Sequence, residues 1–280
     1  MYKSLKTIYD RYGVLIRKDA VFNEGRLTHS HLFRLLKSGQ IERANAAELV
    51  PFEGDVKLCV VTAMWQRPEV FKIFAEHYQK FGLDVICVGS EGYKSKKLAE
   101  SYGFTYLERP NNPLGAKMNA TITEAMKRGY THVICVGSDD LITKDLVDEY
   151  LKLIKDGYHF IGLLDFYFYE LESGKAIYWG GYNDKRIGKT VGAGRVLSSE
   201  LINSWGRKVW NDNDNRYLDK GMQERLNTSS LPQKTFKLKD KGMIAVDLKS
   251  TDNITPFAKW RNSNYISSET ITDCFEHLRH

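Results

Sequence analysis

The hexapeptide Val-Ile-Cys-Val-Gly-Ser occurs twice in this chain, at Val85–Ser90 and at Val133–Ser138. Only the second copy runs directly into two acids, Asp139 and Asp140. Four apolar residues ending in Gly-Ser predict a buried parallel strand that stops at a tight turn. Because ligands of an open α/β sheet bind just past the carboxyl ends of its strands, the second copy is expected to bring two carboxylates to the site of the chemistry.

Two adjacent carboxylates at a strand end could hold a divalent cation. Mg²⁺ and Mn²⁺ prefer carboxylate oxygens and can also bridge the oxygens of a diphosphate. Such an ion screens the negative charge that builds up on a departing nucleotide diphosphate. The alternative is that Asp139 and Asp140 cap the next helix or form a local turn. Thr143 can fill the cap position, which favours the cation site.

The composition is that of an ordinary globular protein. The chain has 280 residues, of which 42% are hydrophobic and 27% are charged. Its formal net charge of +6 suits a phosphate-bearing substrate but falls short of the charge clustering of a dedicated nucleic-acid binder. No apolar segment approaches the roughly 20 residues that a membrane span needs.

The four cysteines favour a reducing compartment over a metal or disulfide framework. Cys59, Cys87 and Cys135 each lie within an apolar run, and the sequence contains no Cys-x-x-Cys pair. Zinc is therefore not expected, and buried free thiols fit a reducing compartment. Because residues 1–12 also lack the apolar stretch of a signal peptide, we expect a cytoplasmic protein.

Residues 1–55 are predicted to form a small helical module. Helical apolar spacing occurs over 5–12 and 32–36, the second ending at Gly39, and a third short helix is expected over 41–49. Two short helices around Gly39 could form a helix-turn-helix, but the second helix is not strongly basic. A helical cap on the main domain is the simpler interpretation.

Residues 56–280 are predicted to form one α/β domain. The first expected strands are Leu58–Ala63, Asp84–Val88, Phe104–Leu107 and His132–Val136, with helices over 69–81, 95–102, 115–128 and 143–154. This repeated alternation predicts a mostly parallel sheet with right-handed crossovers. Later strands are expected over 160–164, 166–169, 175–179, 191–197 and 233–239, and later helices over 199–205, 219–226 and 271–279. The short hairpin spacing after Gly157 indicates antiparallel additions to the sheet.

Two common nucleotide-binding motifs are absent from the sequence, the dinucleotide-binding G-x-G-x-x-G after the first strand and the P-loop. Five other segments, in order, resemble the motifs of GT-A glycosyltransferases, especially the family 2 group. They are the nucleotide-binding strand Cys59–Met64 with Arg67-Pro68, the Gly-x-x-x-Asn helix start in Pro113–Ala120, the metal motif at Ser138–Asp140, the Gly-rich strand Gly192–Leu197 and the helix start Leu218-Asp219. The resemblance covers most of 57–226. Ser138 and Leu218 depart from it, since the family has acids at both positions.

The resemblance implies a GT-A-like (Rossmann-like) fold, a nucleotide-diphosphate sugar as donor, and Mn²⁺ or Mg²⁺ as cofactor. Asp140, helped by Asp139, would hold the metal ion. Some relatives complete the metal shell with a late side chain, for which His277 and Asp247 are candidates. The residues placed at the nucleotide sugar are Thr62, Arg67, Lys117, Asn119, Ser138 and Asp139. Ordinary surface ion pairs would account equally well for Arg67 and Lys117.

The resemblance also places Asp219 as the general base that removes the acceptor's proton, with inversion at the anomeric carbon. A helix N-cap is the alternative role for Asp219. Single-sugar transfer from a donor of the UDP type is favoured, because the Gln-x-x-Arg-Trp signature of processive synthases is missing. The acceptor is expected to be a glycan, a lipid-linked glycan or a modified DNA base, the last contacted by the basic face of 233–239 and the N-terminal module.

Two other functions remain open from the sequence. A sugar-phosphate nucleotidyltransferase has a related sheet, but its Gly-rich loop with a following Lys is missing after the first strand. A binding module for a nucleotide sugar or nucleic acid, without turnover, would fit the loss of an acid at Ser138. The three functions differ in their products, so one set of assays can separate them.

Overall fold

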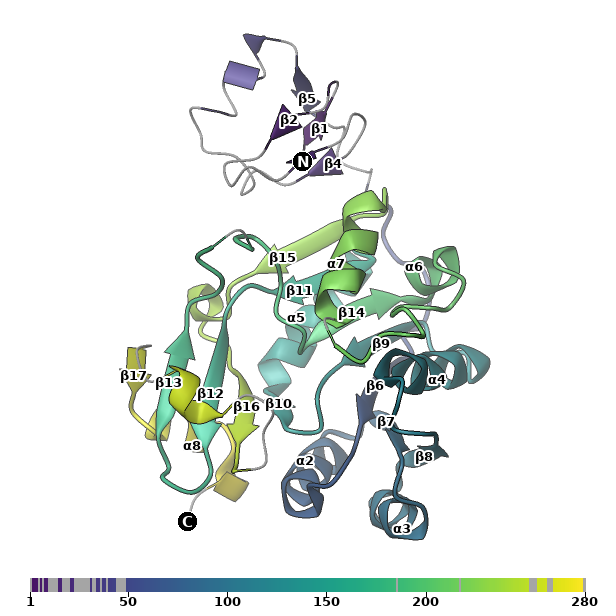
Figure 1. Cartoon of the computed structure of the whole chain (residues 1–280), viewed down its shortest axis with the longest axis vertical. Coiled ribbons are helices and arrows are strands. Elements are labelled where there is room, and N and C mark those ends of the chain that lie inside the picture. Colours follow the sequence, from purple (N-terminus) through teal and green to yellow (C-terminus); the bar gives the residue numbers. More distant parts are fainter. Residues whose placement is uncertain are drawn as a thin grey trace.

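The computed structural model describes residues 49–184, 186–216, 218–251, 256–260 and 264–278. Within 1–48 it describes 2–4, 6, 8–9, 15–16, 21–22, 31, 34–35, 37–38 and 40–43. Its centre is a seven-stranded sheet (Figure 1). In spatial order the strands are β15 (Gln233–Phe236), β11 (Phe160–Leu163), β14 (Arg195–Ser198), β9 (His132–Cys135), β6 (Leu58–Ala63), β7 (Asp84–Gly89) and β8 (Thr105–Glu108).

The sheet is mostly parallel, as predicted. The four strands β9, β6, β7 and β8 run parallel to one another, and β15 runs parallel to β11. Only β14 is antiparallel to both of its neighbours, β9 and β11. The apolar runs of β6, β7 and β9 are continuous because both faces of these strands are buried, and Cys59, Cys87 and Cys135 are free thiols within them.

Helices cover both faces of this sheet. The helices are α2 (Pro68–Phe81), α3 (Tyr93–Ser101), α4 (Leu114–Lys127), α5 (Lys144–Lys155), α6 (Ser199–Ser204) and α7 (Leu218–Thr228). Side chains of α2, α3 and α5 belong to one core cluster, and those of α4, α6 and α7 belong to the other. In α2, Pro68 occupies the first turn and Gly82 ends the helix with a φ of 65°.

A second sheet of five strands adjoins the first. In spatial order its strands are β10 (Asp140–Ile142), β16 (Ala245–Lys249), β12 (Phe166–Glu170), β13 (Ala176–Trp179) and β17 (Asn264–Ile266). The sequence did not predict β10 and β17, which have three residues each and too little periodicity to be recognised. Because β10 begins at Asp140, the edge of this sheet lies at the predicted metal-binding residues.

Asp165 stabilises the connection through which the chain passes from the first sheet to the second. It lies between β11 and β12 and is fully buried. Its carboxylate accepts hydrogen bonds from the backbone N–H of Leu238 at 2.6 Å, from the N–H of Lys239 at 3.2 Å and from the Tyr178 hydroxyl at 2.9 Å. A buried carboxylate satisfied in this way holds three segments in place.

Most predicted elements of 56–280 are found, with boundaries shifted by a few residues. The predicted strand over 191–197 is limited to β14, which begins at Arg195. The predicted helix over 271–279 is replaced by the short α8 (Glu269–Thr272) and a turn of 3₁₀ helix, η4 (Glu276–Leu278). Two further 3₁₀ turns are η2 (Lys239–Lys241) and η3 (Phe257–Trp260).

The helical prediction for residues 1–55 is wrong for most of its described part. The described residues form five short strands, which are β1 (Tyr2–Ser4), β2 (Ile8–Tyr9), β3 (Leu15–Ile16), β4 (Val21–Phe22) and β5 (Ile41–Arg43). Tyr2 pairs with both Phe22 and Arg43, so these strands depend on partners that local periodicity does not reveal. Helical residues occur at 31, 34, 35 and 37. Within the predicted helices, 8–9 and 41–43 are in strands, and most of the remaining positions lie outside the described residues.

None of the helices described here combines the length and the apolar character needed to cross a membrane.

Candidate functional site

A cavity of about 940 Å³ opens at the carboxyl ends of β6 and β9. Residues 63–67, which follow β6, form one wall, and residues 135–140, which follow β9, form the floor. The start of α4 and the start of α7 close the other sides, together with Gly192, Ala193 and Trp210. The cavity therefore lies where an open α/β sheet is expected to bind its ligand.

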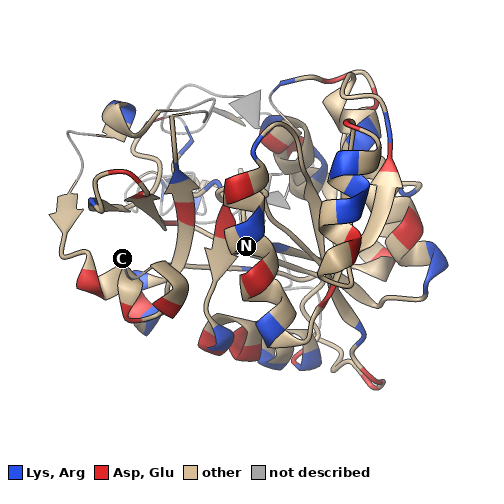
Figure 2. Ribbon diagram, turned by 90° about the horizontal axis from the view of Figure 1, so that it is seen from below, with Lys and Arg blue, Asp and Glu red and all other residues tan. Residues whose placement is uncertain are grey.

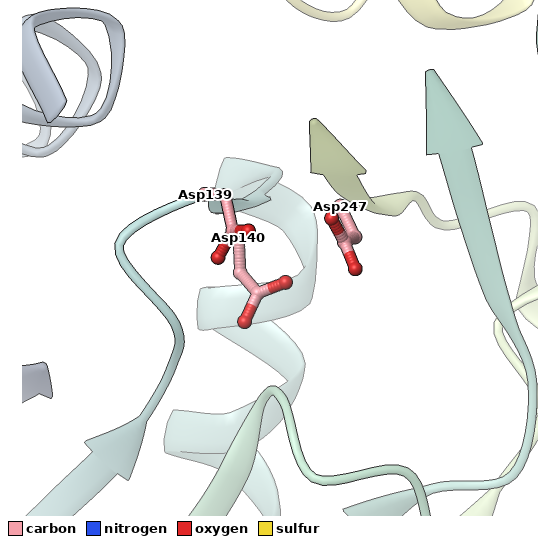
Figure 3. A group of neighbouring side chains, drawn as sticks. All are labelled: Asp139, Asp140 and Asp247. Atoms are coloured by element: carbon pink, nitrogen blue, oxygen red, sulfur yellow. The ribbon is translucent and has the colours of Figure 1, made fainter. Parts of the chain in front are cut away.

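Three aspartates form a cluster at the edge of this cavity, which Asp247 does not itself line. Asp139 and Asp140 line it, and each of Asp139, Asp140 and Asp247 has a carboxylate oxygen within 4.8 Å of the others (Figure 3). Asp247 joins them because β10 and β16 pair in antiparallel register with Asp140 opposite Asp247. Of the two further metal candidates from the sequence, Asp247 is therefore brought to the cluster.

The electrostatics of the cluster favour a bound cation. Burial and then the neighbouring Asp139 raise the pKa of Asp140 well above its usual value. Burial and Asp139 likewise raise the pKa of Asp247, whose Oδ1 is buried and has no hydrogen-bond partner. Carboxylates in this arrangement repel one another, and a divalent ion would relieve the repulsion. An all-oxygen donor set fits Mg²⁺ or Mn²⁺ rather than zinc.

Local backbone contacts account for only part of the geometry of the two adjacent acids. The Gly137 N–H donates a hydrogen bond to Asp140 Oδ2, as in a local turn. Thr143 precedes α5 as predicted, but its hydroxyl donates to the Ile244 carbonyl at 3.0 Å and does not cap the helix. Both aspartates still face the cavity, so the turn positions them at the site.

Arg67 links one wall of the cavity to its floor. Its Nη1 lies 2.6 Å from Asp139 Oδ2, and its Nη2 donates to the Ser138 hydroxyl at 3.2 Å. The side chains of Arg67 and Asp139 are 20% and 14% exposed, so this is a partly buried pair rather than a surface one. Arg67 directly precedes Pro68, the first residue of α2, and the start of this helix fixes its position.

Lys117 is a buried ammonium group at the base of the cavity. Its Nζ donates to the Met64 carbonyl and to Asn111 Oδ1, both at 3.0 Å. Burial lowers the pKa of Lys117 to about 8, although the nearby Glu91 and Glu108 oppose this shift. An ammonium group has a third N–H, which can serve a ligand.

Thr62 and Asn119, which the sequence placed at the nucleotide sugar, do not line this cavity. Thr62 is fully buried within β6, and its hydroxyl has no hydrogen-bond partner. Asn119 faces the other side of α4, where it donates to the Trp210 carbonyl and to Asp212 Oδ1, both at 2.8 Å. Its own Oδ1 accepts from the Trp210 N–H at 3.1 Å. Asn119 therefore supports the cavity wall that contains Trp210.

Asp219 lies on the cavity wall formed by α7 and is 57% exposed. It occupies the first turn of the helix, which begins at Leu218, so it is not the N-cap. Arg195, which the sequence analysis did not single out, lies 3.2 Å from Asp219 and is itself buried. Three further hydrogen bonds hold Arg195, to the hydroxyl and the carbonyl of Thr190 at 3.1 and 3.0 Å and to Met222 Sδ at 3.2 Å. The sequence signal that could have identified Arg195 is that it is the one charged residue in the otherwise apolar segment 191–197.

His277 is not part of the aspartate cluster. It lies against α2, where its ring centroid is 5.5 Å from that of His77 and 6.3 Å from that of Phe275. Burial lowers the pKa of His277, as expected for an imidazole in an apolar environment. The prediction of His277 as a metal ligand does not agree with this position.

Lys249 is a second cation that the sequence analysis missed. It follows Asp247 by two residues on β16, and its Nζ lies 2.6 Å from Asp247 Oδ2. Residues two apart on a strand share a face, so an Asp-x-Lys pattern on a strand predicts such a pair.

No family model and no curated protein matches the chain. Among solved structures, a cytidylyltransferase from Leptospira borgpetersenii is 10% identical, with 65% of this chain and 77% of that chain covered and a TM-score of 0.44. A proposed nucleotide-diphospho-sugar transferase from Desulfovibrio desulfuricans G20 is 12% identical over 80% and 97%, with a TM-score of 0.40. Rv0371c from Mycobacterium tuberculosis, in complex with manganese, is 10% identical over 73% and 96%, with a TM-score of 0.43. At this level of similarity the comparison carries no argument about activity, which has to come from the site.

Proposed function

We propose that the chain is a metal-dependent glycosyltransferase that moves one sugar from a nucleotide-diphosphate sugar, of the UDP type, to an acceptor hydroxyl. The observation that carries the proposal is the cluster of Asp139, Asp140 and Asp247 at a cavity of about 940 Å³ that also contains Arg67 and Lys117. Ligand pockets are typically about 300–1,000 Å³, so this one is large enough for a nucleotide sugar.

The donor half of the site would stabilise the leaving diphosphate. Mn²⁺ or Mg²⁺ held by the three aspartates would screen the charge that develops on the diphosphate as the sugar departs. Arg67 and Lys117 lie on either side and can donate charge-assisted hydrogen bonds to its oxygens. The metal ligands and the two cations come from different elements, so the donor would be held from several directions.

The acceptor half would remove a proton. As the acceptor oxygen attacks the anomeric carbon, its proton would pass to the Asp219 carboxylate, and the bond from that carbon to the diphosphate oxygen would break. The exposure of Asp219 makes it accessible to an acceptor, and its contact with buried Arg195 limits its movement. Attack from the face opposite the diphosphate would give the inverted product.

A glycan or lipid-linked glycan is the acceptor class that we propose. Of the two lysines on the basic face of 233–239, Lys237 is exposed, and Lys239 is engaged with an aromatic ring, its Nζ lying 4.9 Å from the centroid of Tyr178. Figure 2 shows Lys and Arg mixed with Asp and Glu along the helices of the face in view. A nucleic-acid surface would instead require one continuous basic patch.

The proposal is tested by identifying the product. The protein is incubated with UDP-, GDP- and TDP-sugars and Mn²⁺, with and without glycan acceptors or duplex DNA, and the free nucleoside diphosphate is measured. We expect slow donor hydrolysis that a suitable acceptor accelerates. Asp247→Asn should reduce it by roughly a hundredfold, since one metal ligand is weakened.

The same assay separates the rival functions. Pyrophosphate release from a sugar phosphate and a nucleoside triphosphate would identify a nucleotidyltransferase. Nucleotide-sugar binding without any turnover would identify a binding module. The residues after β6, Met64–Arg67, contain no glycine, which disfavours the close approach of a triphosphate to this backbone.

A further inference from the structure

Among the described residues, Arg67 and Lys249 each pair with an aspartate of the cluster, and of these two Arg67 lines the cavity. Arg67 pairs with Asp139 and lines the cavity. Lys249 pairs with Asp247 at 2.6 Å but is not among the residues that line the cavity. Arg67 can therefore exchange its carboxylate for a phosphate oxygen, whereas Lys249 can reach a ligand only through Asp247.

Packing holds Lys249 in place. Its side chain is 5% exposed, and its Nζ lies 5.2 Å from the centroid of the Phe168 ring. Phe168 in turn stacks on Trp260 with their centroids 4.4 Å apart. A buried ammonium group that leaves its carboxylate would lose both the ion pair and the ring contact. Lys249 is therefore a permanent part of the cluster.

The formal charges show what this permanent cation does. In the fully ionised form that binds a metal ion, the three carboxylates carry −3, and Arg67 and Lys249 bring the cluster to −1. A divalent cation would then bring it to +1, so an ion that binds alone enters a cluster that is already mostly neutralised. A nucleotide diphosphate in the cavity supplies the missing negative charge and can also engage Arg67.

We propose that Lys249 is a built-in counter-ion that makes binding of the divalent cation depend on the nucleotide diphosphate. The inference rests on the proposed function, because it concerns the metal and donor of the same site. By linkage, the ion and the nucleotide must strengthen each other's binding by the same factor. The enzyme would then bind its metal mainly together with the donor, and Lys249 would set the size of that coupling.

The coupling can be measured without any turnover. Mn²⁺ is titrated into the full chain with and without UDP, and free Mn²⁺ is followed by electron paramagnetic resonance. In the wild type we expect weak binding of Mn²⁺ alone and tighter binding with UDP. In Lys249→Gln the amide can still donate to Asp247 but the charge is lost. Affinity for Mn²⁺ alone should then rise by roughly tenfold or more, and the effect of UDP should shrink by the same factor.

Two variants make the comparison specific. Lys241→Met removes a lysine from an ion pair of similar length, 2.8 Å to Glu149, and should leave the coupling unchanged. Lys249→Arg keeps the charge and should retain most of the coupling. If Lys249→Gln binds Mn²⁺ alone no better than the wild type does, the inference is wrong.

Each of the remaining outcomes either supports or overturns one of the two proposals. A wild type that binds neither Mn²⁺ nor UDP would overturn the proposed function itself. A Lys249→Gln protein that is unfolded alone but folds when Mn²⁺ is added would support the inference, because the ion would replace the missing charge. A protein that stays unfolded with Mn²⁺ would show that Lys249 is needed for packing alone.

Discussion

The two copies of Val-Ile-Cys-Val-Gly-Ser form buried, parallel strands on either side of β6, yet only one leads to a candidate site. β7 and β9 pair with opposite edges of β6. After β7, the Glu91 carboxylate accepts from the Gln66 N–H at 3.1 Å and from the Ser95 hydroxyl at 3.0 Å, which closes a turn into α3. After β9, the chain continues into β10 and the aspartate cluster. Identical strands therefore acquire different roles from the segments that follow them.

The glycine of each copy shows the same contrast. A Cβ on Gly89 would lie 2.5 Å from the hydroxyl of Tyr106, the tip of a side chain. A Cβ on Gly137 would lie 2.6 Å from Asp139 Oδ1 and 2.8 Å from Asp140 Oδ2. The first glycine makes room for packing, whereas the second makes room for the two carboxylates.

The largest difference is expected between two variants, each of which neutralises the acid that follows one copy of the hexapeptide. Asp140→Asn should reduce release of nucleoside diphosphate by about a thousandfold, because a metal ligand and its charge are lost together. Glu91→Gln, the matched change after the first copy, should reduce it less than about threefold, since the amide can still accept both hydrogen bonds. Similar losses in the two variants would remove the distinction between the copies.

The two glycines give the next largest difference. Gly137→Ala should displace both carboxylates and lower both activity and Mn²⁺ affinity by roughly a hundredfold. Gly89→Ala should lower the free energy of unfolding by about 1–3 kcal/mol as Tyr106 moves aside, with the affinity for Mn²⁺ unchanged. Titration calorimetry with Mn²⁺ and UDP, together with urea unfolding, measures both quantities. Unchanged Mn²⁺ affinity in Gly137→Ala would contradict this account.

The residue before the second copy should make stability depend on pH. Burial lowers the pKa of His132 to about 4. As pH falls below about 6.5, the unfolded chain takes up a proton that the folded chain does not, so the free energy of unfolding decreases. Between pH 6.5 and 5 this amounts to about 1.5 kcal/mol. In His132→Asn, the free energy of unfolding measured with urea should fall less between these two pH values than it does in the wild type. If the free energy of unfolding of His132→Asn fell with pH as steeply as that of the wild type, the folded protein would protonate His132 as readily as the unfolded chain does.

The smallest expected effect concerns Lys117: burial lowers its pKa, and Glu91, the acid that follows the first copy, raises it in part. The pKa of Lys117 is about 8, so UDP affinity should fall by roughly tenfold as pH rises through 8 and the ammonium loses its charge. Glu91→Gln removes an acid that raises this pKa, so the fall should move to lower pH. Lys117→Arg should flatten the profile. Calorimetric titration with UDP and Mg²⁺ from pH 6.5 to 9.5 tests this, and a pH-independent wild type would argue against a role for Lys117.

The sequence predicted the parts of the fold whose signal is local. The strand at 58–63 and the helices that follow it were found because apolar periodicity and turn residues mark them. Strand β10 was missed because Leu141 and Ile142 alone carry no period and its partner, β16, lies about a hundred residues later. Strands β1, β4 and β5 were missed for the same reason, since β1 pairs with segments about 20 and 40 residues away, whereas β2 and β3 have two residues each and are too short to show a period.

The candidate site shows a similar division. Asp139 and Asp140 could be predicted because the acids directly follow a recognisable strand. The position of Arg195 against Asp219 depends on β14 meeting α7, which no spacing in the sequence specifies. Asn119 fits the family motif in sequence but holds Trp210 in the structure. The motif segment therefore reaches the cavity through Leu114 and Lys117, whereas the side chain of Asn119 points away from it.

The pairing of Asp140 with Asp247 also bears on which insertions and deletions this chain can tolerate. Side chains alternate between the faces of a sheet, so adding one residue within β16 would turn Asp247 away and bring an apolar neighbour to the cluster. The same addition in the loop around Gly242, which precedes the strand, would leave the alternation intact. Insertions and deletions should therefore be tolerated in the loop before Ala245 and should disrupt the aspartate cluster within β16, which follows it.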